Sequence, residues 1–558
     1  MPFEMDRQMY GAMYGPTAGD RVRLGDTDLF ALIERDYTDY GNEILGGWGK
    51  NLRAGMMYSH RSARDSELDN VISNAIIMDP VMGVFKGSIG IKDGTLVGTG
   101  RAGNPDIMDD VGLVIGPNTV VYRGDGLIAT PGGVDSHVHI GNNPKLMDVA
   151  LSAGLTTLIG AGLNTTGRST IHGWLRSFEN IPVNLALQAR GSASHTSPMV
   201  ESIEAGAAGF KIHEDEGAYP YVIDTCLRVA DEYDVSVALH TDGLHESMQV
   251  SDTIEAIGGR AVHAYHVEGA GGGHAPDLIR LAGMNNIITS STTPTIPYTV
   301  STYEEHFHMT AQVHNVNVAA PPEAAALDER LRRETMAAED VLHDMGAVPI
   351  INSDSQGMGR IGEVITRTWQ LAHKMKGERG ATHPEHDNER ILRYLSKYTL
   401  NPAVTHGLSS YVGSLEPGKM ADVVLWSPAF FGVKPDMVIK GGVVAWSPSG
   451  EGNASIRLCE PVTYGPAFGA LGNSAARSSA FFVSQASLES GLQQRLGTRR
   501  KLMPVRDVRT VTKRSMVRNS FNPRIDVDLE SKRINVDGRV VTSSPMGEAP
   551  LNRLYTLA

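Results

Sequence analysis

The sequence contains very little cysteine. Cys226 and Cys459 are its only two cysteines among 558 residues, and no Cys-x-x-Cys pair occurs. Two cysteines are too few for a disulfide framework, so a reducing compartment such as the cytosol fits the composition. A zinc-thiolate site is excluded as well, so any metal must be held by histidine, carboxylate or an unusual ligand.

Long apolar runs and basic patches are also missing. Residues 1–7 lack the basic segment and apolar core of a signal peptide, and no apolar run approaches the roughly 18 residues of a membrane span. The net charge of −13 argues against binding to nucleic acid phosphate. We therefore expect a cytoplasmic protein that binds neither nucleic acid nor membrane. The short basic run Arg499-Arg500-Lys501 is most simply a solvated or subunit-contacting face.

What the sequence does contain is a long alternation of apolar strands and helical stretches between residues 131 and 410. The apolar runs include residues 183–187, 209–212, 235–239, 261–265 and 348–351. Repeated strand-helix units over this length predict an α/β fold, a (β/α)₈ TIM-like barrel, with a doubly wound sheet as the alternative.

The flanking regions have a different pattern. Residues 1–130 read as short β segments, with Asp93-Gly94 as a hairpin signal, and residues 411–465 return to the same strand and turn chemistry. We interpret these two regions as halves of one composite β domain. Residues 466–558 are expected to form a C-terminal segment that packs on the barrel and on neighbouring subunits.

The most informative motif is His137-Val138-His139, which follows an apolar run. Side chains alternate along a strand, so both imidazoles can point the same way and bind a transition metal. A His-x-His pair also occurs by chance in ordinary strands, so the pair needs further ligands.

Further candidates stand where other apolar runs end, and in a barrel such positions share one mouth. They are Lys211, His213, His240, His266 and Asp354. A single strand-end His is more often capped or solvent-facing, and a strand-end Asp is often a helix N-cap. Their co-occurrence at equivalent places nevertheless predicts a metal centre. So many ligands indicate two metals, which need a bridge, and Lys211 could supply one only as a carbamate formed with carbon dioxide.

The residues resemble those of the urease alpha (catalytic) subunit family of the amidohydrolase superfamily. Beyond the metal-site stretches, the resemblance rests on residues 14–24, 266–277, 332–335, 353–356 and 426–432. It implies a nickel-dependent hydrolase that acts on urea with two Ni²⁺ ions per chain. It also implies beta and gamma subunits, nickel-delivery accessory proteins, and a higher oligomer such as a trimer of heterotrimers.

The resemblance also assigns roles to the site residues. Carbamylated Lys211 (N6-carboxylysine) would bridge the ions, His240 and His266 would complete one nickel, and His137, His139 and Asp354 the other. His213 would hydrogen-bond the urea carbonyl, and Gly271 and Gly357 would lie along the substrate pocket. His314 on a helical flap would be the general acid, with Asp215 and Arg330 tuning it.

The chain departs from its family around this site. The segment after His139 reads Ile140-Gly141-Asn142-Asn143, and Val313, Glu216 and Gly357 stand where the family has cysteine, tryptophan and alanine. Two alternatives to urea hydrolysis follow: a dinuclear amidohydrolase acting on another small amide or urea derivative, and a non-catalytic paralogue.

Overall fold

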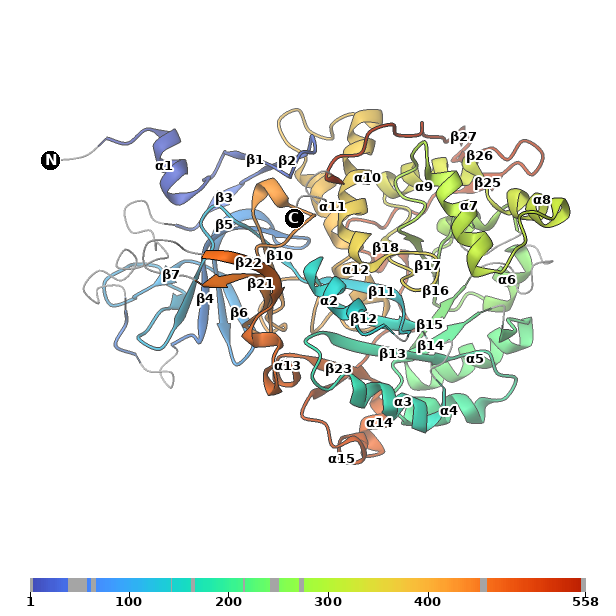
Figure 1. The fold of residues 1–558 in the computed structure, drawn as a ribbon, viewed down its shortest axis with the longest axis horizontal. Coiled ribbons are helices and arrows are strands. Elements are labelled where there is room, and N and C mark those ends of the chain that lie inside the picture. The colour runs from blue at the N-terminus through green and yellow to red at the C-terminus, as the bar shows by residue number, and fades with distance from the viewer. Residues whose placement is uncertain are drawn as a thin grey trace.

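The structure is a computed structural model that describes residues 4–38, 58–61, 67–141, 143–161, 166–213, 216–240, 250–269, 275–451 and 459–552. A β domain and an α/β barrel lie side by side, with the N-terminal strands in the β domain and the middle of the chain in the barrel (Figure 1). In the described part of the chain, no helix is long and apolar enough to cross a membrane.

The barrel strands pair in chain order, and all of their pairings are parallel. They are β11 (Gly133–His139), β12 (Leu155–Ala161), β13 (Asn184–Arg190), β14 (Gly209–Ile212), β15 (Ser236–Leu239), β16 (Val262–Ala264), β17 (Ile287–Thr292) and β18 (Ile350–Asn352). The chain after β18 returns to β11, because the His139 backbone N–H donates to Ser355 O at 2.9 Å. The predicted barrel is confirmed. The doubly wound alternative is wrong, because such a sheet reverses its strand order and stays open at both edges.

Helices connect these strands and cover the outside of the barrel. They are α2 (Lys145–Ser152), α3 (Gly167–Ser177), α4 (Thr196–Glu204), α5 (Pro220–Tyr233), α6 (Val250–Ile257), α7 (Thr302–Val313), α8 (Pro321–Arg330), α9 (Arg333–Met345), α10 (Val364–Arg379), α11 (Asn388–Lys397) and α12 (Leu400–Thr405), with 3₁₀ turns η4 (Leu278–Gly283) and η5 (Ile361–Glu363).

Helix α5 shows how the sequence sets such an element. Pro220 occupies its first turn, where the missing N–H costs nothing, and Asp234 ends it with a left-handed φ of 48°. Ile223, Cys226 and Leu227 are spaced by three and four residues, so they share one buried face. Each fully buried side chain of this size contributes about 1.5–3 kcal/mol.

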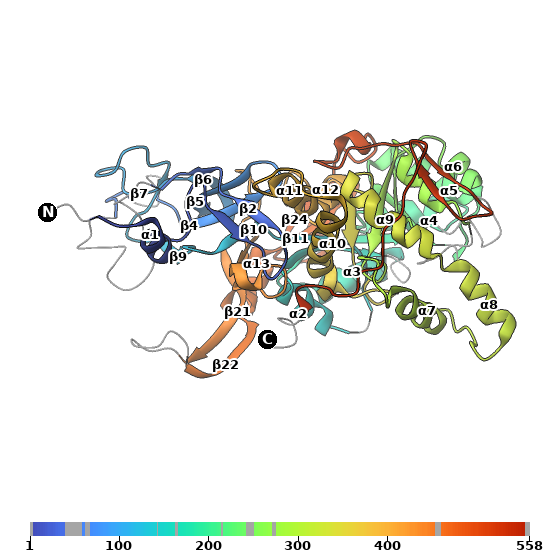
Figure 2. The same cartoon turned by 90° about the horizontal axis from the view of Figure 1, so that it is seen from above.

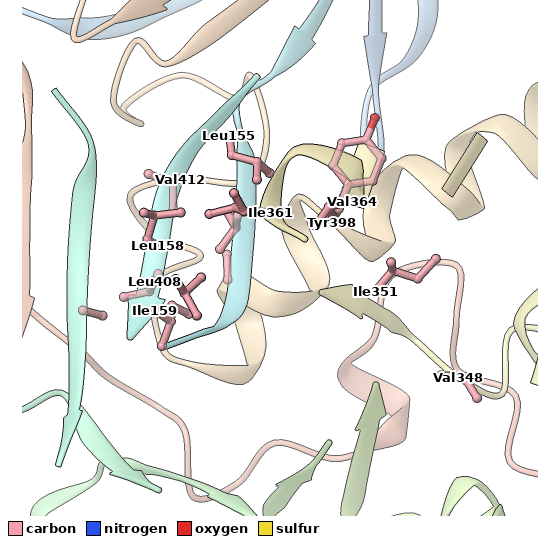
Figure 3. Packing of buried hydrophobic residues seen from close by; sticks show 14 of the residues in the cluster. Leu155, Leu158, Ile159, Val348, Ile351, Ile361, Val364, Tyr398, Leu408 and Val412 are labelled. Atoms are coloured by element: carbon pink, nitrogen blue, oxygen red, sulfur yellow. The ribbon is translucent and has the colours of Figure 1, made fainter. Parts of the chain in front are cut away.

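The interior of the barrel and its helices form one continuous apolar cluster. Figure 3 shows part of it, including Leu155 and Leu158 of β12, Ile361 of η5 and Tyr398 beyond α11. This packing holds the strand ends that carry the candidate ligands.

The β domain is built from both sides of the barrel in the sequence. Its main sheet contains β3 (Arg35–Asp36), β4 (Asn70–Asp79), β5 (Gly83–Lys92), β6 (Thr95–Gly100), β9 (Val120–Arg123), β10 (Ile128–Pro131), β19 (Val423–Trp426), β20 (Met437–Lys440), β21 (Val443–Glu451) and β22 (Cys459–Pro466). Strand β10 pairs antiparallel with β19, which joins the two halves. The composite β domain is confirmed. The Asp93-Gly94 turn between β5 and β6 has φ values of 50° and 72°, as a two-residue hairpin turn requires.

A buried polar contact ties the β domain to the barrel. The carboxylate of Asp422 lies 2.5 Å from Lys440 Nζ and accepts a hydrogen bond from Asn184 Nδ2 at 2.7 Å. Asn184 begins barrel strand β13, whereas Asp422 and Lys440 belong to the β domain. Removing one partner of an ion pair buried at this depth lowers the free energy of unfolding by about 3–5 kcal/mol. The contact therefore fixes how the β domain and the barrel meet.

The remaining elements are short. They are α1 (Arg7–Tyr14), β1 (Arg21–Arg23), β2 (Phe30–Leu32), β7 (Ala102–Gly103), β8 (Leu113–Val114), η6 (Pro428–Phe430), η7 (Phe468–Ala470), α13 (Asn473–Ser478), β23 (Ala480–Val483), α14 (Gln485–Glu489), α15 (Leu492–Leu496), β24 (Lys501–Pro504), η8 (Lys513–Ser515), β25 (Ile525–Val527), β26 (Ile534–Val536) and β27 (Arg539–Val540). Strand β23 pairs with barrel strand β13. The residue boundaries of the four regions stay a prediction.

The expectation that the basic run after α15 is a solvated or subunit-contacting face is wrong for Arg500. Its side chain is 1% exposed, and its guanidinium donates to the carbonyls of Glu179 and Val183 at 3.1 and 2.8 Å. Backbone carbonyl oxygens between α3 and β13 accept these hydrogen bonds and so offset the cost of burying the guanidinium charge. Arg500 therefore anchors the C-terminal segment to the barrel.

Candidate metal centre

The structure brings the seven strand-end residues to one mouth of the barrel. His137 and His139 end β11, Lys211 lies in β14 with His213 just after it, His240 follows β15, His266 follows β16, and Asp354 follows β18. Parallel strands of a barrel all end at the same face, which explains why residues so far apart in sequence meet.

Asp354 is the centre of one half of the cluster. Its Oδ1 lies 3.2 Å from His137 Nε2 and 3.1 Å from His139 Nε2. Lys211 Nζ lies 3.5 Å from the same His137 nitrogen. His137 and Lys211 are each 1% exposed, whereas the His139 side chain is 17% exposed and therefore reaches the mouth.

The other half consists of three imidazoles in contact, with the His213 and His240 rings tilted and the His240 and His266 rings edge to face. His266 Nε2 lies 3.0 Å from His240 Nδ1, and the His240 ring lies 3.9 Å from that of His213, measured between centroids. Two ligand nitrogens bound to one ion at 2.0–2.1 Å are about 3 Å apart, so the His240 and His266 spacing suits a shared ion.

Burial keeps these imidazoles neutral. It lowers the pKa of His137, His240 and His266 well below the ordinary value, and the charge of Lys211 lowers it further. Burial also lowers the pKa of His213. Burial alone would raise the pKa of Asp354, but the hydrogen bond and charge of His139 outweigh it and lower that pKa. Neutral imidazole and ionised carboxylate are the forms that bind a metal.

The backbone is held in an unusual conformation at two of these positions. His266 has φ of 32° and Asp354 has φ of 55°, in the left-handed region that side chains other than glycine rarely adopt. Each such residue costs about 1–3 kcal/mol, which surrounding packing must offset. The fold therefore tolerates a loss of stability at His266 and Asp354, because this backbone conformation directs the two side chains into the mouth.

The donor set fits a metal ion. Ligand atoms of His137, His266 and Asp354 all lie within 4.8 Å of one another. The nitrogens that converge there are the Nε2 atoms of His137 and His266, which lie 3.2 Å from Asp354 Oδ1 and 3.0 Å from His240 Nδ1, respectively. Converging nitrogen and oxygen donors of this kind suit nickel, zinc, manganese or iron.

A pair of helices projects from the barrel near its mouth. Figure 2 shows α7 and α8 projecting from the barrel, and we call them the flap. His314 directly follows α7, and its Nε2 lies 3.5 Å from Arg330 Nη2 at the end of α8. The charge of His314 adds to the lowering of the pKa of His213 and His240 that burial causes, so the flap histidine lies close enough to act on the cluster electrostatically.

Two predicted site residues, Asp215 and Gly271, lie outside the described residues. The sequence interpretation also missed a residue, Tyr265, whose ring stacks on His137 with 3.7 Å between centroids. Tyr265 ends the apolar run 261–265 directly before His266, and no feature of the sequence distinguishes it from an ordinary core residue.

The positions that depart from the family lie around the mouth. Glu216 forms an ion pair with Arg190 at the end of β13, with 2.6 Å between Glu216 Oε1 and Arg190 Nη2. Val313 is 47% exposed at the end of α7. A Cβ atom on Gly357 would lie 2.6 Å from Asp354 Oδ1 and 3.2 Å from His139 Cδ2, so this glycine leaves room for two of the candidate ligands.

The substitution Gly357→Val should therefore weaken metal binding by about tenfold, because its branched side chain pushes Asp354 away from His139, whereas the alanine of the family adds only one methyl group. Metal titration and elemental analysis of the purified protein measure this effect. Gly377→Val is the matched control, since nothing lies within 4 Å of a Cβ at that position in α10. Equal metal affinity in both variants would contradict this prediction, because it would show that displacing Asp354 from His139 does not weaken metal binding.

Comparisons with known proteins agree with this architecture. The model of the "Amidohydrolase family" matches residues 128–524, and that of the "Urease alpha-subunit, N-terminal domain" matches residues 3–122. "Urease subunit alpha" of Haloquadratum walsbyi is 49% identical, and that of Staphylococcus aureus is 48% identical, each with 100% of both chains covered. A solved D-hydantoinase from Bacillus sp. AR9 has a TM-score of 0.50 at 13% identity, covering 74% of this chain and 98% of its own, so it shares the fold.

Proposed function

The chain belongs to the urease alpha-subunit family, and from this premise we propose that it is the catalytic subunit of a urease. The reaction is the hydrolysis of urea to ammonia and carbamate, and carbamate then decomposes to a second ammonia and carbonic acid. The observation that carries the proposal is the convergence of five imidazoles, Lys211 and Asp354 at one barrel mouth.

The proposed cofactor is a pair of nickel ions. His240 and His266 would hold one ion, His137, His139 and Asp354 the other, and a carbamate on Lys211 would bridge them. The choice of nickel and of the carbamate comes from the family, since the donors alone also suit other metals. When bound, the ions would polarise the urea carbonyl and supply hydroxide near neutral pH.

The residues of the chain have separate tasks in this proposal. His213, neutral because of its burial, would donate a hydrogen bond to the carbonyl oxygen as it gains negative charge. His314 would protonate the departing nitrogen, with Arg330 and Asp215 tuning it. Gly271 and Gly357 would shape the substrate pocket, and flap closure would exclude water.

The proposed assembly follows from the family. The chain would combine with urease beta and gamma subunits in a higher oligomer such as a trimer of heterotrimers, and nickel-delivery accessory proteins would load its site. Val313 at the exposed end of α7 and Glu216 at the mouth would bear on substrate choice more than on metal binding.

A second candidate function is hydrolysis of another small amide or urea derivative. The Arg190–Glu216 ion pair favours it, because the pair places charged groups beside the loop that carries His213. A charged rim would select a substrate by polarity as well as by size.

An ammonia-release assay separates these functions. The chain is expressed with its partner subunits in the presence of nickel and bicarbonate, and kcat/KM is compared for urea, N-methylurea, formamide and acetamide. We expect urea to exceed each analogue by about 100-fold or more, because a hydrogen-bonding pocket rejects an analogue that lacks one of the substrate's N–H groups. A preferred analogue would establish the second function. A protein with two bound nickel ions per chain that hydrolyses none of the four would be the non-catalytic paralogue.

A further inference from the structure

Tyr265 is buried inside the barrel, next to the candidate ligands His137 and Lys211. It is 0% exposed, and its hydroxyl donates to Ser136 O at 2.7 Å and lies 3.0 Å from the side-chain amide oxygen of Gln188. Ser136 belongs to β11 and Gln188 to β13, so the phenol is anchored on two other strands. These contacts fix the plane of its ring.

The fixed ring is a platform for His137. The two rings are 3.7 Å apart between centroids and inclined by only 12°, so they stack face to face. In this orientation His137 Nε2 faces Asp354 Oδ1 at 3.2 Å. Any rotation of the imidazole about its long axis would break the stacking as well as the contact with Asp354.

Lys211 rests on the same platform. Its Nζ lies 3.9 Å from the centroid of the Tyr265 ring and 3.5 Å from His137 Nε2. The aromatic face thus supports two neighbouring candidate ligands from below, and it leaves their donor atoms directed toward the mouth of the barrel.

The stacking replaces a contact that metal-binding histidines ordinarily have. Such a histidine usually donates its second ring N–H to a carboxylate or carbonyl, which fixes the ring plane. The Nδ1 atom of His137 is buried and has no hydrogen-bond partner within the described residues. The plane of His137 must therefore be fixed in another way.

We propose that Tyr265 is a positioning residue that holds His137 and Lys211 in the geometry required for metal binding. It acts through its stacked aromatic face, to which the anchored hydroxyl adds only a smaller contribution, and it does not touch the substrate. The inference rests on the proposed function for the identity of the metal, but it concerns metal affinity, which is measured without urea.

The test compares three variants of the full chain. Tyr265→Leu and Tyr265→Met remove the aromatic face, and both should weaken binding of Ni²⁺ by about 10- to 100-fold, as loss of the outer partner of a ligand does. Tyr265→Phe keeps the face and should bind Ni²⁺ within a few-fold of the unchanged protein. Binding is measured by titrating Ni²⁺ into metal-free protein with bicarbonate present, and the nickel absorption spectrum reports changes in ligand geometry.

Tyr398→Leu is the matched control for loss of a buried tyrosine. Tyr398 is 1% exposed and accepts a hydrogen bond from Trp369 Nε1 at 3.2 Å, and it is not one of the seven strand-end residues at the barrel mouth. This variant should lose thermal stability and keep its metal affinity. Tyr265→Met, whose flexible side chain fills gaps, provides the result if Tyr265→Leu does not fold.

Two outcomes would overturn the proposal. One is wild-type nickel affinity and spectrum in a folded Tyr265→Leu or Tyr265→Met variant. The other is a loss of nickel affinity in Tyr398→Leu as large as that in the Tyr265 variants, which would show that general destabilisation lowers the affinity. A protein that hydrolyses no urea, but whose metal affinity depends on the Tyr265 ring, would contradict the proposed function and leave this inference standing.

Discussion

Replacing Lys211 by methionine should leave the protein without its metal pair and without activity. Methionine keeps an unbranched side chain only one atom shorter than lysine but offers no amine to carbon dioxide, so the proposed bridge cannot form. The loss of activity should exceed the roughly 100-fold that outer partners of metal ligands cost. Elemental analysis for nickel and the ammonia-release assay, each with and without bicarbonate during loading, measure the two effects.

The control for Lys211 is another buried lysine. Lys397 donates to Val348 O and Asn519 Oδ1, both at 2.6 Å, and takes no part in the cluster. Lys397→Met should be less stable but should bind nickel normally in its folded fraction, with the same dependence on bicarbonate as the unchanged protein. Two nickel ions per chain in Lys211→Met would contradict the bridging role.

The second large effect is expected from His314→Ala. Loss of a general acid lowers kcat by about 10²- to 10⁴-fold. The nickel content should stay unchanged, because His314 lies on the flap beside Arg330 and outside the ligand cluster. In the unchanged enzyme, activity should fall at high pH as the acid loses its proton, and the variant should lack that alkaline decline.

His308→Ala is the matched control for this prediction. His308 lies on the same helix α7, and its side chain is exposed. The variant should keep both its kcat and its pH profile. Nickel loss in His314→Ala would instead assign His314 to the metal centre, and an unchanged kcat would remove it from catalysis.

The sequence was informative about where strands end. The apolar runs and the polar residues after them predicted both the barrel and the cluster at its mouth, because parallel strands of a barrel end together. Residues His240 and His266 could be placed at one mouth without knowing any distance. The composite β domain was predictable for a similar reason, since strand and turn chemistry resumed after the barrel.

What the sequence could not predict is how side chains are oriented within that frame. Nothing in the pattern indicates that Tyr265 stacks on His137, or that Asp354 and His266 adopt a left-handed backbone. Arg500 shows the same limit, because its burial depends on carbonyl groups of a distant segment. The roles of His314 and Arg330 came from the family resemblance, and the structure adds that the two side chains meet.

The pairing of β10 with β19 has a consequence for how the protein folds during its synthesis on the ribosome. Ile128 is synthesised long before its neighbour Trp426, and the whole barrel emerges between them. Until then, the edge of β10 presents unpaired backbone groups beside apolar residues, the condition that favours association with other chains. The nascent chain therefore has to complete its barrel before its first domain can close, and chaperones that shield this strand edge should raise the yield of folded protein.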